Sequence, residues 1–202
     1  MFPHDPHETY GRREVILEPA RLITPAEYLV FERAAETKHE YDNGHVFPTA
    51  GASERHNLIV VNLIAAIHPQ LRGGPCRVYP SDMRLHVVSS GLYAYPDVTV
   101  VCGASELEDE HLDTLLNPTV LIEVLSPSTE RYDRGRKAAF YRTLDSLREY
   151  VFVSQDQARI ERYARSDERQ WVLSEAVERE DRIALESIGC ELSIAEVYEG
   201  VF

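Results

Sequence analysis

The chain has 202 residues, of which 44% are hydrophobic and 27% are charged, and its formal net charge is −13. This composition is typical of an ordinary globular domain, and no apolar run approaches the roughly 20 residues that span a bilayer, so we expect no membrane partner. The acidic charge argues against a wide DNA-binding surface, although it allows a local basic rim around an acidic metal site. We expect a cytoplasmic protein, because the first residues lack the apolar core of a signal peptide.

The cysteine pattern points to free thiols. Cys76, Cys102 and Cys190 are far apart, odd in number and never arranged as CxxC. This spacing disfavours a disulfide framework or a zinc site and fits a reducing compartment. We expect all three side chains to fill the core.

The first part of the chain carries a helix-start signal. We expect residues 1–13 to form a flexible leader and residues 14–202 to form a single domain. Thr24 can cap a helix, Pro25 suits its first position, and Glu27 completes a capping box. These residues predict a helix that begins after Thr24.

The remainder alternates between helical and extended patterns. Asn43-Gly44 predicts a β-hairpin, and a long apolar helix with Ser53 as its cap should follow. The order of elements predicts an α/β (α+β) domain with a central mixed β-sheet flanked by helices. Strands are expected at 76–80, 83–88, 97–102, 119–125, 149–154, 158–165 and 171–176, a further helix at roughly 130–146, a loop at 89–96, and a surface loop or short helix at 104–118.

Two carboxylates lie in expected central strands. Glu123 interrupts the apolar run "VLIEVL", and alternation places Asp97 near the start of another strand. If these strands are neighbours, the two carboxylates lie side by side and repel each other unless a cation intervenes. A hard cation such as Mg²⁺ resolves the conflict, and an ion pair between Glu123 and an arginine is the alternative.

A lysine follows on the apolar face of the next helix. Lys137 shares this face with Phe140, Tyr141 and Leu144, which lie three, four and seven residues further on. Its ammonium group is therefore placed to reach the carboxylates of the preceding strand. The alternative is a lysine that extends along the helix to water.

Taken together, these motifs resemble a known family. Pro96-Asp97, "IEVLSPST" and Lys137 resemble the PD-(D/E)xK nuclease superfamily, and "EYDNGHVFPTAGASERH", "YPSDMRLHV" and "YPDVTVVCG" resemble its Uma-two family of restriction-endonuclease-like proteins. The resemblance runs from about residue 23 to the C-terminus and implies a restriction-endonuclease-like fold. One position departs from the superfamily pattern, because Leu125 stands where a lysine is expected. The resemblance implies that Lys137 has taken over this role, and lost activity is the other meaning of Leu125.

The resemblance also implies roles for the site residues. Asp97 and Glu123 would bind Mg²⁺ or Mn²⁺ with the backbone carbonyl of Val124, and Glu40 would be an additional acidic residue unless it is a solvated hairpin carboxylate. Lys137 would position or help to deprotonate the attacking water. Other candidates are Asp82 and His56 as possible pocket residues, and Arg131, Arg134 and Arg136 as phosphate contacts unless they are solvated helix charges.

The expected function is that of a metal-dependent endonuclease that hydrolyses phosphodiester bonds in DNA, acting as a homodimer because duplex cleavage needs two cuts. A catalytically inactive nuclease fold, kept as a binding or regulatory module, is the alternative that Leu125 and the net charge favour. A hydrolase for smaller phosphate esters is a third.

Overall fold

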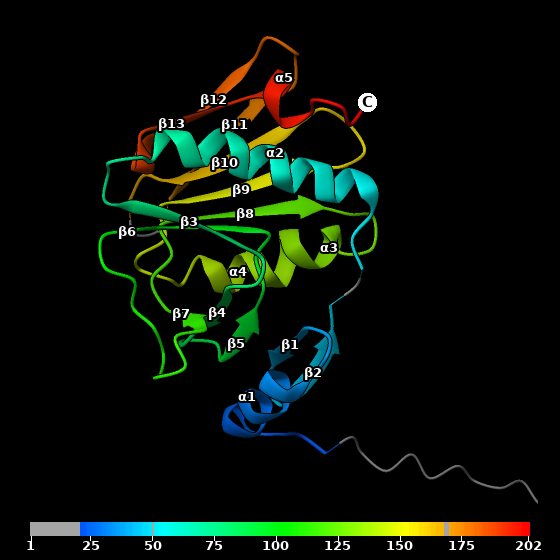
Figure 1. Ribbon diagram of the computed structural model, residues 1–202, viewed down its shortest axis with the longest axis vertical. Coiled ribbons are helices and arrows are strands. Elements are labelled where there is room, and N and C mark those ends of the chain that lie inside the picture. The colour runs from blue at the N-terminus through cyan, green and yellow to red at the C-terminus, as the bar shows by residue number, and fades with distance from the viewer. Residues whose placement is uncertain (1–20, 50, 168–169) are drawn as a thin grey trace, which may run out of the picture.

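The computed structural model describes residues 21–49, 51–167 and 170–202 (Figure 1). The predicted leader, residues 1–13, and the expected start of the domain at residue 14 lie outside this part of the chain. Within it, no helix is both long and apolar enough to cross a membrane.

Helix α1 (Pro25–Ala34) begins at the predicted position. The hydroxyl oxygen of Thr24 accepts a hydrogen bond from the Glu27 backbone N–H, and the Glu27 carboxylate accepts one from the Thr24 backbone N–H. This reciprocal capping box satisfies two backbone donors that the helix itself cannot pair.

The predicted hairpin follows as β1 (His39–Asp42) and β2 (His45–Pro48). Its two turn residues, Asn43 and Gly44, have φ angles of 48° and 89°. Such left-handed angles let a two-residue turn match the twist of the paired strands.

A six-stranded mixed sheet forms the centre of the molecule, which confirms the expected fold class. Its strands in spatial order are β11 (Trp171–Ala176), β10 (Ile160–Arg165), β9 (Glu149–Ser154), β8 (Val120–Leu125), β6 (Val98–Cys102) and β3 (Cys76–Pro80). Strands β8 and β9 are parallel, and the other neighbours are antiparallel. All six residues of β8 are buried, as is typical of a strand that is covered on both faces.

Helix α2 (Glu54–Gln70) covers one face of this sheet (Figure 1). The Ser53 hydroxyl caps it by accepting a hydrogen bond from the backbone N–H of the third helical residue. Its fully buried residues, Ile59, Leu63 and Ile67, recur at every fourth position and pack on the valines and isoleucines of the sheet.

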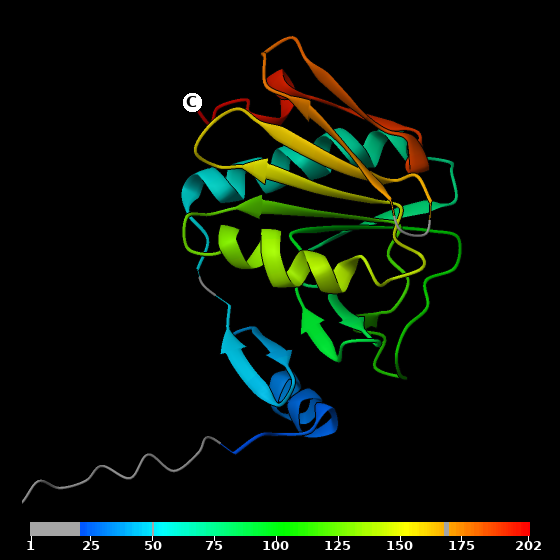
Figure 2. The ribbon, with the colours of Figure 1, turned by 180° about the vertical axis from the view of Figure 1, so that it is seen from behind.

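The opposite face carries a second helical stretch that contains a π-helical turn (Figure 2). It consists of α3 (Glu130–Tyr132), the π-helical segment Asp133–Lys137 and α4 (Ala138–Tyr141). The Ala138 N–H donates to the Asp133 carbonyl five residues back, which widens the helix at this point. The predicted helix at 130–146 is therefore present, but it ends at Tyr141.

A five-stranded sheet contains two strands in segments that we expected to be loops or helix. Its order is β2, β1, β5 (Leu92–Ala94), β4 (Arg84–Val87) and β7 (Thr114–Leu115). The three residues of β5 are buried, and its hairpin with β4 turns through Gly91 at φ 74°. Strands of two or three residues are too short to show alternation, so the predictions at 89–96 and 104–118 were wrong there.

The C-terminal part of the chain packs against α2. Strands β12 (Arg182–Leu185) and β13 (Cys190–Ser193) form an antiparallel pair joined by a 3₁₀ turn, Glu186–Ile188. The short helix α5 (Ile194–Val197) then packs beside α2.

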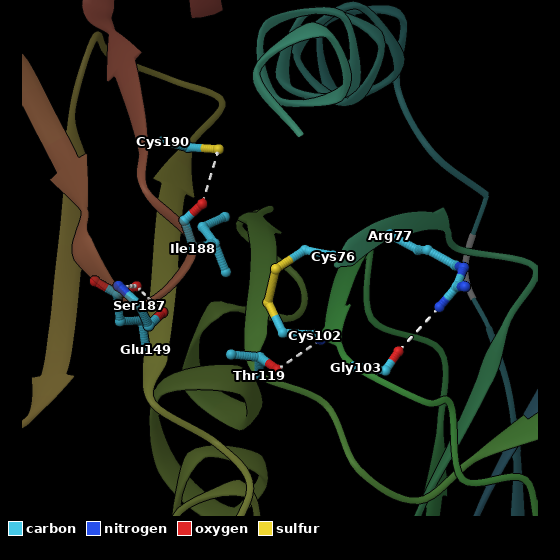
Figure 3. Close-up of a disulfide and its surroundings, with 9 residues drawn as sticks. All are labelled: Cys76, Arg77, Cys102, Gly103, Thr119, Glu149, Ser187, Ile188 and Cys190. Carbon is cyan, nitrogen blue, oxygen red and sulfur yellow. Dashed lines mark hydrogen bonds between the residues drawn. A yellow bond between two sulfur atoms is a disulfide. The ribbon is translucent and has the colours of Figure 1, made fainter. Parts of the chain in front are cut away.

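The prediction of three free cysteines was wrong for two of them. Cys76 and Cys102 form a disulfide between the neighbouring strands β3 and β6 (Figure 3). They are directly opposite in the strand register, so their Cα atoms are 3.9 Å apart despite a separation of 26 in the sequence. Only Cys190 is free, and it is buried as expected. The cysteines therefore give no support to a reducing compartment.

Candidate active site

Strand pairing brings Asp97 and Glu123 together. Val98 of β6 lies opposite Ile122 of β8, and the same antiparallel register continued by one residue sets Asp97 opposite Glu123. Oδ2 of Asp97 accepts a hydrogen bond from the Val124 backbone N–H at 2.7 Å. The condition that we set from the sequence, that the two strands are neighbours, is met.

Lys137 reaches this strand pair from the helical stretch. Its Nζ lies 2.9 Å from Oε1 of Glu123, and its side chain is only 5% exposed. The same ammonium lies 3.5 Å from Oδ1 of Asp133, which precedes it by one turn in the π-helical segment. The ion-pair partner of Glu123 is therefore a lysine and not an arginine, and this lysine does not extend to water.

Glu40 joins the cluster from the hairpin. Its Oε1 lies 3.1 Å from Nζ of Lys137 and also accepts a hydrogen bond from the Tyr95 backbone N–H at 3.4 Å. The Glu40 side chain is 14% exposed, so it is not a solvated hairpin carboxylate. Lys137 thus connects three elements: the hairpin, β8 and the helical stretch.

Two further side chains orient the carboxylates. Nε2 of His56, from the first turn of α2, lies 3.0 Å from Oδ1 of Asp97. The Tyr141 hydroxyl donates to Oε1 of Glu123 at 3.2 Å. Each carboxylate of the strand pair is therefore held from a different helix.

The electrostatics of the cluster reflect an excess of negative charge. Burial raises the pKa of the Glu123 carboxyl well above its usual value, and it also raises the pKa of Asp133. Burial opposes the charged form of Lys137, but the surrounding acidic groups, Glu123 foremost, outweigh burial and raise the pKa of the ammonium. Three carboxylates, those of Glu40, Glu123 and Asp133, contact this one ammonium, and Asp97 lies opposite Glu123 in the continued strand register, so a further cation is electrostatically favoured here.

The donor set fits a hard divalent cation that is completed by other ligands. Among the described residues, no three His, Cys, Asp or Glu side chains form a ready-made metal-binding group. Mg²⁺ commonly takes one or two protein carboxylates, with waters and substrate phosphates as its other ligands. The contacts of Glu123 and Glu40 that the structure describes all use Oε1, which leaves each Oε2 for a ligand.

The other predicted site residues lie away from the cluster or are engaged elsewhere. Asp82, in the turn after β3, has an 88% exposed side chain and pairs with Lys38. Arg134 pairs with Glu130 and Glu161, and Arg136 pairs with Asp42 at 2.7 Å. Arg131 is exposed on α3.

Sequence reasoning missed two members of the cluster, Asp133 and Tyr141. Both lie four residues from Lys137, one on each side, so helical periodicity places all three on one face. The spacing was therefore visible in the sequence. We read Tyr141 only as an apolar neighbour and gave Asp133 no role.

The strand order and the helices on both faces of the sheet define a restriction-endonuclease-like fold. The crystal structure of a "putative nuclease belonging to DUF820" from Anabaena variabilis ATCC 29413 matches with a TM-score of 0.73, covering 89% of this chain and 99% of that one. The two sequences are only 16% identical, so this likeness concerns the fold.

The model of the Uma2 family, described as "Putative restriction endonuclease", matches residues 25–195, and the chain belongs to this family. The resemblance inferred from the motifs is thus confirmed. Two uncharacterized proteins of Synechocystis sp. are also similar. One, slr1290, is 34% identical over 183 residues, covering 91% of this chain and 95% of the relative. The other, sll1609, is 35% identical over 161 residues, covering 80% and 91%.

Proposed function

We propose that this protein is a metal-dependent endonuclease that hydrolyses phosphodiester bonds in DNA. The observation that carries the proposal is the position of Lys137, whose ammonium lies between Glu123 and Glu40. Asp97 lies opposite Glu123 in the continued strand register. A structural ion pair needs only one carboxylate for each lysine, whereas this site gathers several more than its charge balance requires.

Asp97 and Glu123, with the Val124 carbonyl, would hold Mg²⁺ or Mn²⁺. When bound, such a cation lowers the pKa of water and offsets the charge that develops on a phosphate under attack. The residues of the chain keep the carboxylates in place for this task. His56 and the Val124 N–H bind Asp97, and Tyr141 binds Glu123.

Lys137 keeps its proton at neutral pH, because the carboxylates around it raise the pKa of its ammonium. It therefore acts as a hydrogen-bond donor that positions water or a phosphate oxygen, and it does not act as the base. Donors fixed in a site that excludes water are effective at stabilising developing negative charge.

The basic residues and the oligomeric state are part of the same proposal. Arg131 contributes to phosphate binding, since it is exposed on α3, while Arg134 and Arg136 are largely neutralised by their carboxylate partners. We propose a homodimer, because cutting both strands of a duplex needs two active sites. The expected cytoplasmic location stays a prediction, and the disulfide does not favour it.

A second candidate is a catalytically inactive nuclease fold that binds a partner. Leu125 occupies the expected lysine position and is 4% exposed in the apolar core, and the net charge of −13 disfavours a long DNA contact. This candidate predicts that DNA is not hydrolysed under any metal condition.

The experiment is hydrolysis of end-labelled DNA and RNA duplexes of one sequence, with Mg²⁺ or Mn²⁺, by the wild type and by Asp97→Asn. Asparagine can still accept the hydrogen bond from Val124, so the variant should fold. We expect the wild type alone to cut DNA. Equal cutting by both proteins would contradict the proposal, cutting of RNA alone would overturn the choice of DNA, and no cutting would favour the binding module.

A further inference from the structure

We propose that a cavity beside the candidate active site binds one nucleotide, with a pyrimidine base among aromatic rings and its phosphate against arginines at the rim. The inference rests on the proposed function for the source of the nucleotide, which is the nucleic-acid substrate. A free mononucleotide has the same chemistry and is distinguished by the test below.

The cavity lies between the helical stretch and the sheet. Its volume is about 100 Å³, and the sheet lines it with Tyr150, Phe152, Tyr163 and Trp171. This volume is less than the roughly 150 Å³ of an apolar cavity that holds benzene in another protein, so the cavity takes no more than one six-membered ring and disfavours a purine. Bases bind well to aromatic side chains, because every base has a π-face that can stack.

Two faces of the same helical stretch separate the cavity from the carboxylate cluster. Asp133, Lys137 and Tyr141 form the stripe toward Glu123, whereas the stripe one residue further on lines the cavity. That second stripe consists of Arg134, Ala138 and Arg142. The cavity and the carboxylate cluster thus lie along neighbouring stripes of one helical stretch.

Tyr150 links the two regions and carries an unused polar group. Its hydroxyl is buried and makes no hydrogen bond with the protein residues that the structure describes. Burial, and next the carboxylate of Glu123, raise the pKa of this hydroxyl, so the enclosed oxygen belongs to the cluster side and the ring is what lines the cavity. The Tyr150 ring lies 5.3 Å from the ring of Tyr141, which holds Glu123, and 4.5 Å from the ring of Phe152.

Arginines lie at the rim of the cavity and beside it, and Arg134 among them is paired with Glu130 and Glu161. Arg142 is exposed, and no ion pair is formed by its guanidinium among the described residues. Arg165 lies 4.7 Å from the Trp171 ring, and its guanidinium donates to three backbone carbonyls, so its charge remains. Burial, and next the nearby Arg148, lower the pKa of Arg165, whereas Asp145 raises it, and a bound anion would offset the repulsion from Arg148. In an acidic protein, such a group of arginines fits a phosphate.

The single tryptophan of the chain, Trp171, reports on the cavity by its fluorescence. The metal-free protein is titrated in EDTA with dTMP, with dAMP, with a single-stranded thymine oligonucleotide, and with an abasic oligonucleotide of equal length. We expect saturable quenching by the thymine oligonucleotide and much weaker quenching, if any, by dTMP and dAMP. Quenching by the oligonucleotide alone assigns the site to the nucleic-acid strand, and equally tight binding of dTMP assigns it to a free nucleotide.

Variants separate binding from folding. Arg142→Glu should weaken binding by roughly tenfold or more, because a charge-assisted phosphate contact becomes repulsive. The matched control is Arg72→Glu, a charge reversal at an exposed residue after α2 on the other side of the sheet, which should leave binding unchanged. Tyr150→Phe keeps the ring that lines the cavity and removes only an enclosed hydroxyl, so it should leave binding unchanged and serves as a second control.

Quenching by the abasic oligonucleotide that equals quenching by the thymine oligonucleotide would overturn the inference. So would an unchanged affinity of Arg142→Glu, or the absence of quenching by any ligand. All readouts use metal-free protein, so they are independent of cleavage. A protein that binds the thymine oligonucleotide but never cuts would sink the proposed activity and keep this site.

Discussion

The ammonium of Lys137 lies 2.9 Å from the carboxylate of Glu123. The two residues are 14 positions apart in the sequence, one in the π-helical segment and the other in β8. The lysine thus reaches the carboxylate from the helical stretch, whereas the superfamily pattern would place a lysine on the same strand as the carboxylate. Leu125, at the usual lysine position, instead packs in the apolar core on the same face of β8 as Glu123.

Replacing Lys137 by methionine should abolish most DNA cleavage. We expect a loss of about 100-fold or more, because a fixed hydrogen-bond donor to developing negative charge contributes on that scale. We also expect a loss of roughly 3 kcal/mol in unfolding free energy, because buried carboxylates lose their partner. The double variant Lys137→Met with Glu123→Gln should recover part of the stability and none of the activity. A folded Lys137→Met protein that cuts at the wild-type rate would refute the role.

The position of Leu125 offers a test of whether the lysine has changed its location. In the Lys137→Met background, Leu125→Lys should raise cleavage roughly tenfold above that background, since its side chain starts on the same face as Glu123. Leu125→Met in the same background controls for altered packing and should give no gain. Absence of any gain in a folded protein would show that the two lysine positions are not equivalent.

Much of this arrangement followed from the sequence. The capping box at Thr24, the hairpin turn at Asn43 and the alternation in β8 are local signals, and each gave the correct element. The neighbouring positions of β6 and β8 could only be stated as a condition, because strand order depends on contacts between distant residues. The disulfide was missed for the same reason, since strand pairing alone brings Cys76 to Cys102.

The stability of the protein should depend on pH through Asp113. Its hydrogen bond from Arg33 holds the pKa of the Asp113 carboxyl well below its usual range, and Arg84 acts in the same direction. A lowered folded-state pKa gives stability that is present above the unfolded value and is lost as pH falls through the folded one. Asp113→Asn should therefore cost roughly 1 kcal/mol at pH 7, after discounting for solvent screening, and less as pH falls from about 5 to 2.

Urea unfolding at several pH values measures this difference. Glu110→Gln, a neutralisation of an exposed residue in the same loop, is the control and should change little. A cost for Asp113→Asn that stays constant across the acidic range would contradict the assignment.

The disulfide predicts a defined pattern of alkylation. In denaturant without reductant, iodoacetamide should modify only Cys190, and after reduction it should modify all three cysteines. Reduction should lower the unfolding free energy by about 3 kcal/mol, as expected for a cross-link that closes a loop of this length. Mass spectrometry that finds three alkylated cysteines before reduction would show that the thiols are free.

The central claim is that the carboxylates around Lys137 hold a divalent cation, and calorimetric titration with Mn²⁺ tests it most directly. We predict saturable binding to the wild type that is weakened roughly tenfold or more in Glu123→Gln, because a carboxylate ligand is lost, and that is unchanged in Glu110→Gln. No saturable binding to the wild type, or equal affinity in wild type and Glu123→Gln, would contradict the claim.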